Sequence, residues 1–88
     1  MSLEDRFKDA QSRVQKLPSR PDNLSLLSLY ALYKQSTVGD ASGKRPGALD
    51  FKGRAKYDAW SAKQGTGKDD AMQLYIDLVN QLEFASTG

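Results

Sequence analysis

Cysteine and histidine are both absent from these 88 residues. Without cysteine the chain can form no disulfide and no thiol nucleophile, and without histidine it has no imidazole base, no hydrolase triad and no zinc finger. No carboxylate pair stands in an apolar context either. We therefore predict that the protein is not an enzyme, and we expect no metal site and no cofactor.

Long apolar runs are also missing. No run approaches the 18 residues of a membrane span, and Glu4, Asp5 and Arg6 interrupt the start of the chain where a signal peptide needs an apolar core. The 39% hydrophobic and 27% charged residues are ordinary for a globular protein. We expect one cytoplasmic domain over residues 1–88, monomeric and without stable membrane insertion.

The net charge is small, but the charged residues are unevenly placed. The net charge is +2, yet residues 34–68 hold eight basic and three acidic residues, whereas residues 69–88 hold four acidic residues and no basic one. A basic middle segment can attract an anion. For any single lysine in it, however, a solvated surface position is the simpler interpretation.

The apolar residues recur at helical spacing, and no useful β-type alternation is present. We predict a first helix from about Leu3 that Pro18 closes, with one buried stripe. A second helix is expected to begin at a cap formed by Asp22 or Asn23 and to reach about Val38, where Gly39 ends it. The buried stripe of the first helix comprises Leu3, Phe7, Ala10, Val14 and Leu17.

The second half of the chain predicts two more helices after a long loop. A loop over residues 39–52 is long for so small a domain, and such loops are often functional. Its segment 45–48 (Arg-Pro-Gly-Ala) predicts a type II turn, and Leu49 and Phe51 are expected to anchor it to the core. A third helix should cover about 52–64. A fourth should begin at Thr66–Asp69 and fray from Ala85 onward. Four helices with one long connection make an all-α four-helix bundle.

One face of the expected second helix combines apolar side chains with groups that can bind an anion. At about 100° per residue, Tyr30, Tyr33 and Lys34 share a face, with Leu26 and Leu27 one turn earlier. Tyrosine offers a ring for stacking and a hydroxyl for a phosphate, and lysine offers a compact positive charge. Together with Lys56 and Tyr75, this set could hold a nucleotide-bearing ligand. Half-buried core tyrosines with solvated lysines are an equally good interpretation from the residues alone.

Four blocks of sequence resemble the acyl-CoA-binding protein family in order and spacing. Tyr-Lys-Gln-Ser-Thr-Val-Gly-Asp followed by Arg-Pro-Gly is the most specific part of the pattern. The resemblance covers about residues 7–82. The blocks are LYALYKQSTVGD at 29–40, RPGALDFKG at 45–53, AKYDAW at 55–60 and DAMQLYID at 70–77.

The resemblance implies an up-down-down-up bundle that binds long-chain acyl-coenzyme A without catalysis. It implies three groups of ligand contacts. Tyr30, Lys34 and Lys56 would hold the 3′-phosphate of the adenosine. Tyr33 would pack against the adenine with Tyr75 nearby, and Lys52 would lie at the rim. Leu26, Leu27 and Ala55 would form the floor beneath the acyl chain.

The chain departs from the family pattern at two positions. Gln15 stands where some members carry a basic side chain that contacts phosphate, so that Lys16 or Arg13 would have to substitute for it. Tyr57 stands where many members have tryptophan.

The resemblance implies an intracellular carrier and pool former in lipid metabolism, with transient contacts to acyl-CoA-using enzymes. Two other classes of function compete with it. A nucleic-acid-binding module would use the basic middle segment, but the acidic residues of 69–88 speak against it. A helical protein-interaction domain would use Tyr30 and Tyr33 as a binding patch.

Overall fold

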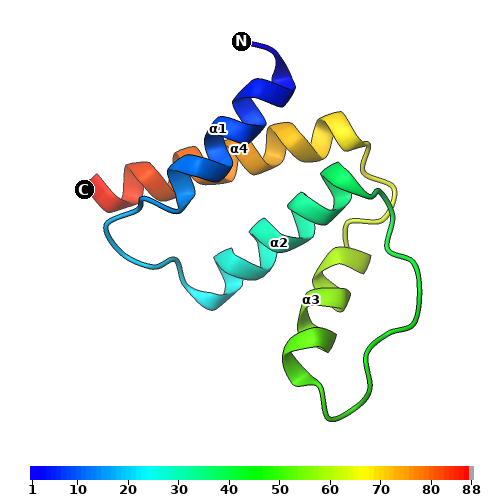
Figure 1. The fold of residues 1–88 in the computed structure, drawn as a ribbon. Helices are drawn as coiled ribbons and strands as arrows, with labels where there is room; N and C mark the ends of the chain where they lie inside the picture. The colour runs from blue at the N-terminus through cyan, green and yellow to red at the C-terminus, as the bar shows by residue number, and fades with distance from the viewer. Residues whose placement is uncertain (88) are drawn as a thin grey trace.

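The computed structural model describes residues 1–87 and contains four α-helices. They are α1 (Leu3–Val14), α2 (Asn23–Thr37), α3 (Phe51–Ser61) and α4 (Lys68–Thr87). In Figure 1, α1 and α4 run one way while α2 and α3 run the other. The predicted all-α fold, with its long connection between the second and third helices, is confirmed.

The helices α2 and α4 form the centre of the arrangement (Figure 1). Between residues 1 and 87, α4 packs against both α1 and α2, whereas α3 packs against α2 alone. The core cluster accordingly comes from three helices only. Its buried members are Phe7, Ala10, Leu29, Leu32, Ala71, Tyr75, Ile76 and Val79.

The predicted start of α1 is confirmed, but its end is not. The side chain of Ser2 caps the helix by accepting a hydrogen bond from the backbone N–H of Asp5 at 3.1 Å. The helix then ends at Val14, before the predicted Leu17. The Lys16 N–H bonds the Arg13 carbonyl in a tighter turn at 3.0 Å, and a residue preceding proline disfavours helical backbone.

The ends of α2 follow the prediction. Asp22 caps its start, where its carboxylate accepts the N–H of Ser25 at 2.7 Å. This hydrogen bond holds the pKa of Asp22 below its usual range. At the other end Gly39 adopts a φ of 100°, and its N–H bonds the Lys34 carbonyl at 3.2 Å. A left-handed residue at this position favours glycine.

The bounds of α3 and α4 differ from those predicted. Asp50 caps α3 through the N–H of Gly53 at 3.0 Å, and the helix ends at Ser61 rather than Gln64. Hydrogen-bonded turns continue from there to Gly65, whose φ is 90°. Helix α4 begins at Lys68, so that Thr66 lies outside it.

The C-terminal end of α4 is helical through Thr87, and the prediction of fraying from Ala85 is wrong. Leu82 packs against the core cluster, and Arg13 of α1 pairs with Glu83. These contacts hold the last turns against α1. Gly88 was also included in that prediction, but it lies outside the described residues.

Two predictions about the long loop are wrong. Gly47 lacks the positive φ that a type II turn needs, and the turn instead closes through the Asp50 N–H and the Gly47 carbonyl at 3.0 Å. Leu49 and Phe51, which were expected to anchor the loop, are 92% and 75% exposed.

Polar side chains of α3 hold the loop instead. Arg45 of the loop forms a two-pronged ion pair with Asp58, at 2.8 and 2.7 Å. This pairing lowers the pKa of Asp58 and raises that of Arg45. Tyr57 donates its hydroxyl to the Gly43 carbonyl at 3.1 Å. Hydrophobic periodicity carries no record of such contacts, which explains why the sequence did not reveal them.

Candidate functional site

A groove of about 630 Å³ lies between α2 and α3. On each helix the lining residues fall at spacings of three and four, which places them on one face. Six residues singled out from the sequence meet here: Leu26, Leu27, Tyr30, Lys52, Ala55 and Lys56. The groove is completed by Arg20, Asn23 and Phe51.

The groove is lined by apolar and by positively charged residues. Leu26, Leu27 and Ala55 are among the apolar ones, and the lining includes Arg20, Lys52 and Lys56 but no carboxylate among the residues the structure describes. An apolar cavity of this size with a few polar groups is the usual form of a ligand site. This one suits a molecule with a hydrocarbon part and an anionic part.

Arg20 and Phe51 were missed in the sequence interpretation. Arg20 lies in the connector between α1 and α2, and periodicity says nothing about where a connector side chain points. The sequence shows only that Arg20 comes shortly before the start of α2. The structure shows that it lines the same groove as Leu26 and Leu27. Phe51 was assigned to the core, but it borders the groove and remains 75% exposed.

Each of the two helices facing the groove places a lysine over an aromatic ring of the other. The Lys56 ammonium lies 5.3 Å from the centroid of the Tyr30 ring. One turn further along both helices, the Lys34 ammonium lies 4.9 Å from the Trp60 ring. Such cation–π contacts stabilise a defined lysine position. The predicted Tyr30, Lys34 and Lys56 set is therefore brought together at the α2–α3 interface.

Tyr33 and Tyr75 lie on the α1 side of α2. The Tyr33 ring is 40% exposed, with its centroid 6.2 Å from that of Phe7. Tyr75 is 6% exposed and packs edge-on against Phe7 at 5.1 Å. Burial raises the pKa of the Tyr75 hydroxyl, and the neighbouring Tyr33 raises it further. Tyr75 is thus a core residue, whereas Tyr33 is partly exposed.

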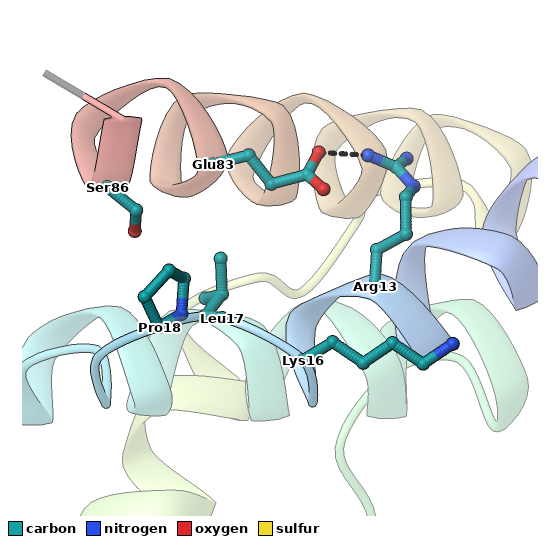
Figure 2. Close-up of a pocket in the computed structure, with 6 residues that line it drawn as sticks. All are labelled: Arg13, Lys16, Leu17, Pro18, Glu83 and Ser86. Carbon is teal, nitrogen blue, oxygen red and sulfur yellow. Dashed lines mark hydrogen bonds and ion pairs between the residues drawn. The ribbon is translucent and has the colours of Figure 1, made fainter.

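The α1 residues considered as phosphate contacts lie elsewhere. Gln15 is exposed at the end of α1 and is absent from the groove lining. Arg13 and Lys16 line a separate cavity of about 260 Å³ beside α4 (Figure 2). Arg13 is committed there to ion pairs with Glu83 and with Asp9, the latter at 2.8 Å.

Lys16 is also directed away from that ion pair. Figure 2 shows its side chain extending along α1, away from Glu83 and Ser86. Neither Arg13 nor Lys16 lies among the residues that line the groove. The groove itself offers Arg20 as an additional cation.

A polar network fixes the end of α2 that carries Lys34. The Gln35 side chain is 1% exposed and donates to the Asp40 carboxylate and to the Thr66 carbonyl, each at 2.8 Å. Asp40 also accepts the N–H of Gly65 at 2.8 Å. The hydrogen bond from Gly65, and to a lesser extent that from Gln35, holds the pKa of Asp40 below its usual range. The motif residues Gln35 and Asp40 thus join α2 to the turn between α3 and α4.

Comparison with known proteins agrees with this geometry. The model of the family described as "Acyl CoA binding protein" matches residues 4–79. The chain belongs to the acyl-CoA-binding protein family. The "Acyl-CoA-binding protein homolog" of Manduca sexta is 51% identical over 89 residues, covering 100% of this chain and 98% of the relative. The "Acyl-CoA-binding protein" of Brassica napus is 48% identical over 82 residues, or 93% of this chain and 89% of that one.

A solved member of the acyl-CoA-binding protein family has the same fold. The crystal structure of Oryza sativa Acyl-CoA-Binding Protein 2 superposes with a TM-score of 0.92 at 42% sequence identity. The match covers 99% of this chain and 98% of the rice protein. The family resemblance found in the sequence is thereby confirmed.

Proposed function

We propose that this chain binds medium- to long-chain fatty acyl-CoA thioesters non-covalently and without catalysis. The observation that supports the proposal is the α2–α3 groove, whose lining of apolar and cationic side chains matches an acyl chain joined to a phosphorylated nucleotide. The relatives named for acyl-CoA binding support the choice of ligand.

We assign the adenosine 3′-phosphate to Tyr30, Lys34 and Lys56 at the α2–α3 interface. Tyr30 and Lys56 face each other across the groove, and Lys34 follows one turn later. Two ammonium groups and a phenolic hydroxyl give charge-assisted hydrogen bonds to a phosphate. In this proposal Tyr33 packs against the adenine. Phe7 supports the Tyr33 ring, and Tyr75 packs against Phe7 in turn.

The acyl chain is assigned to the groove floor formed by Leu26, Leu27 and Ala55. Burying hydrocarbon contributes about 0.8 kcal/mol per methylene, so the chain supplies most of the affinity. We place Lys52 at the rim. Arg20 adds a cation to the groove of this chain, which carries Gln15 where some family members carry a basic residue. On this basis we expect roughly nanomolar binding of long acyl-CoA, weak binding of free coenzyme A and little binding of free fatty acid.

In the cell the proposed role is that of a monomeric cytoplasmic carrier and pool former in lipid metabolism. Transient contacts with acyl-CoA-using enzymes would deliver the ligand. No helix among the described residues has the length and apolar character needed to cross a bilayer.

Isothermal titration calorimetry with palmitoyl-CoA, coenzyme A and palmitate tests the proposal. Palmitoyl-CoA should bind far more tightly than either part alone. Palmitate binding as tightly as palmitoyl-CoA would overturn the assignment, because the nucleotide contacts would then contribute nothing.

Matched variants locate the site. Lys56→Ala should weaken palmitoyl-CoA binding by about tenfold or more, the loss of one charge-assisted contact, with unchanged helix content. Lys8→Ala, an exposed lysine of α1 outside the groove, is the control and should bind as the unmodified chain does. Equal losses in both variants would show that only the general charge of the surface matters.

A further inference from the structure

Trp60 is the buried residue that α3 contributes, and none of the proposed ligand contacts uses it. Its side chain is 7% exposed, with Tyr57 edge-on at 6.3 Å. A buried indole on a helix that packs against α2 alone would ordinarily be explained as packing. Its ring, however, also lies against the Lys34 ammonium.

Three contacts connect Trp60 with Lys34 and with the turn that follows α2. The Lys34 ammonium lies over the indole ring at 4.9 Å from its centroid. The indole N–H donates to the Gly39 carbonyl at 2.7 Å. The Gly39 N–H in turn donates to the Lys34 carbonyl at 3.2 Å. The indole is therefore hydrogen-bonded to the turn that ends α2, and the Lys34 ammonium from the last turns of α2 lies over the same indole.

The contact with the indole ring restricts the Lys34 side chain, which would otherwise be free to rotate. Lysine loses considerable rotamer entropy when it is fixed, and a lysine already held over a ring has lost part of that freedom before a ligand arrives. Such preorganisation raises affinity for a group that the ammonium contacts. Because the proposed function assigns Lys34 to the anionic end of the ligand, the gain should be confined to that end.

We propose that Trp60 is a positioning residue that holds Lys34 in reach of the adenosine 3′-phosphate and so sets the preference for that phosphate. The inference rests on the proposed function. Trp60 does not touch the ligand in this scheme and acts only through Lys34.

The test compares palmitoyl-CoA with palmitoyl-3′-dephospho-CoA, which differ only in the phosphate assigned to Lys34. The measured quantity is the ratio of the two affinities. Lys34→Met should reduce this ratio strongly. Trp60→Leu should reduce it by about threefold to fivefold, the value of a partly exposed cation–π contact. Trp60→Phe, which keeps a ring face, should recover most of the ratio.

Two controls separate positioning from general damage. Tyr57→Leu removes a neighbour of the indole that has no lysine contact of this kind, and should leave the ratio unchanged. In the Lys34→Met background, Trp60→Leu should have no further effect on the ratio. A Trp60→Leu protein with the unmodified ratio, or with equal loss for both ligands, would overturn the inference.

A measurement on the unmodified chain covers the case in which Trp60→Leu does not fold. In the NMR spectrum, the ring current of the single tryptophan should shift the ε-methylene protons of Lys34 upfield of those of lysines that lie over no aromatic ring of residues 1–87, such as Lys8. An unshifted Lys34 would overturn the inference. If the unmodified chain binds neither palmitoyl ligand, the proposed function itself has failed, and the two failures are thus distinguishable.

Discussion

The two sides of α2 are held by different forces. Toward α1 and α4, α2 buries Leu29 and Leu32 in an apolar cluster. Toward α3 it presents a groove and two cation–π pairs, and Trp60 is the one buried α3 residue among those the structure describes. The first side provides stability. The second leaves apolar surface open for a ligand, and polar contacts keep α3 in place without filling the groove.

The largest expected effect comes from removing apolar volume on the core side. Phe7 contacts both Tyr33 and Tyr75 and is 5% exposed. Phe7→Ala should lower the free energy of unfolding by about 3–5 kcal/mol, much of the total for a domain of this size. Urea unfolding followed by circular dichroism measures it.

The matched control is the phenylalanine of the groove side. Phe51→Ala removes the same side chain from a 75% exposed position and should change the free energy of unfolding by no more than about 0.5 kcal/mol. Comparable destabilisation by both variants would contradict the division of α2 into a stabilising side and a ligand side.

A smaller effect is expected from the polar network at the end of α2. Gln35→Ala would remove the buried side-chain amide that donates to the Asp40 carboxylate and to the Thr66 carbonyl. The expected loss is about 1–3 kcal/mol, the range for losing hydrogen bonds of which one goes to a charged group. Gln81→Ala, at an exposed position of α4, serves as the control in the same urea titration and should be neutral.

Acid should loosen the groove side before the core side. The carboxylates of Asp22, Asp40 and Asp58 all have pKa values lowered by hydrogen bonds in the folded chain. A lowered folded-state pKa means that the stabilisation is complete above the unfolded value of about 3.9. It is then lost as the pH falls through the folded-state values.

Hydrogen exchange can locate this loss. Below about pH 4, amides of α3 and of the loop before it should exchange faster, because Asp40 and Asp58 both hold that region. Amides of α1 and α4 should keep their protection to lower pH. Simultaneous loss in all four helices would argue against two separable regions.

The smallest effect is expected from the exposed ion pair between Arg45 and Asp58. Asp58→Asn removes one charge from a pair whose side chains are about half exposed, and exposed pairs contribute little to global stability. The urea midpoint should therefore stay unchanged, while hydrogen exchange in the loop quickens. Asp69→Asn, on α4, is the matched control and should leave the loop unaffected; a lowered midpoint for Asp58→Asn would show that the loop contributes to the global fold.

Much of the fold could be predicted from the sequence because helical periodicity and caps are local. The stripe through Phe7 and Ala10, the cap at Asp22 and the left-handed Gly39 depend on residues within a few positions of one another. The ends of α1 and α4 could not be read in this way. Contacts between Arg13 and Glu83, far apart in the chain, help to decide where α4 remains ordered.

For the site, the sequence by itself determined which chemistry is impossible and which face of α2 carries Tyr30 and Lys34, and the family resemblance supplied the ligand. Only the tertiary structure decided that Arg20 borders the groove and that Tyr75 is a core residue. It also placed the Lys34 ammonium over the Trp60 ring. The physical reason is that spacing along the chain fixes the face of a helix, whereas the neighbour of that face depends on how the helices pack.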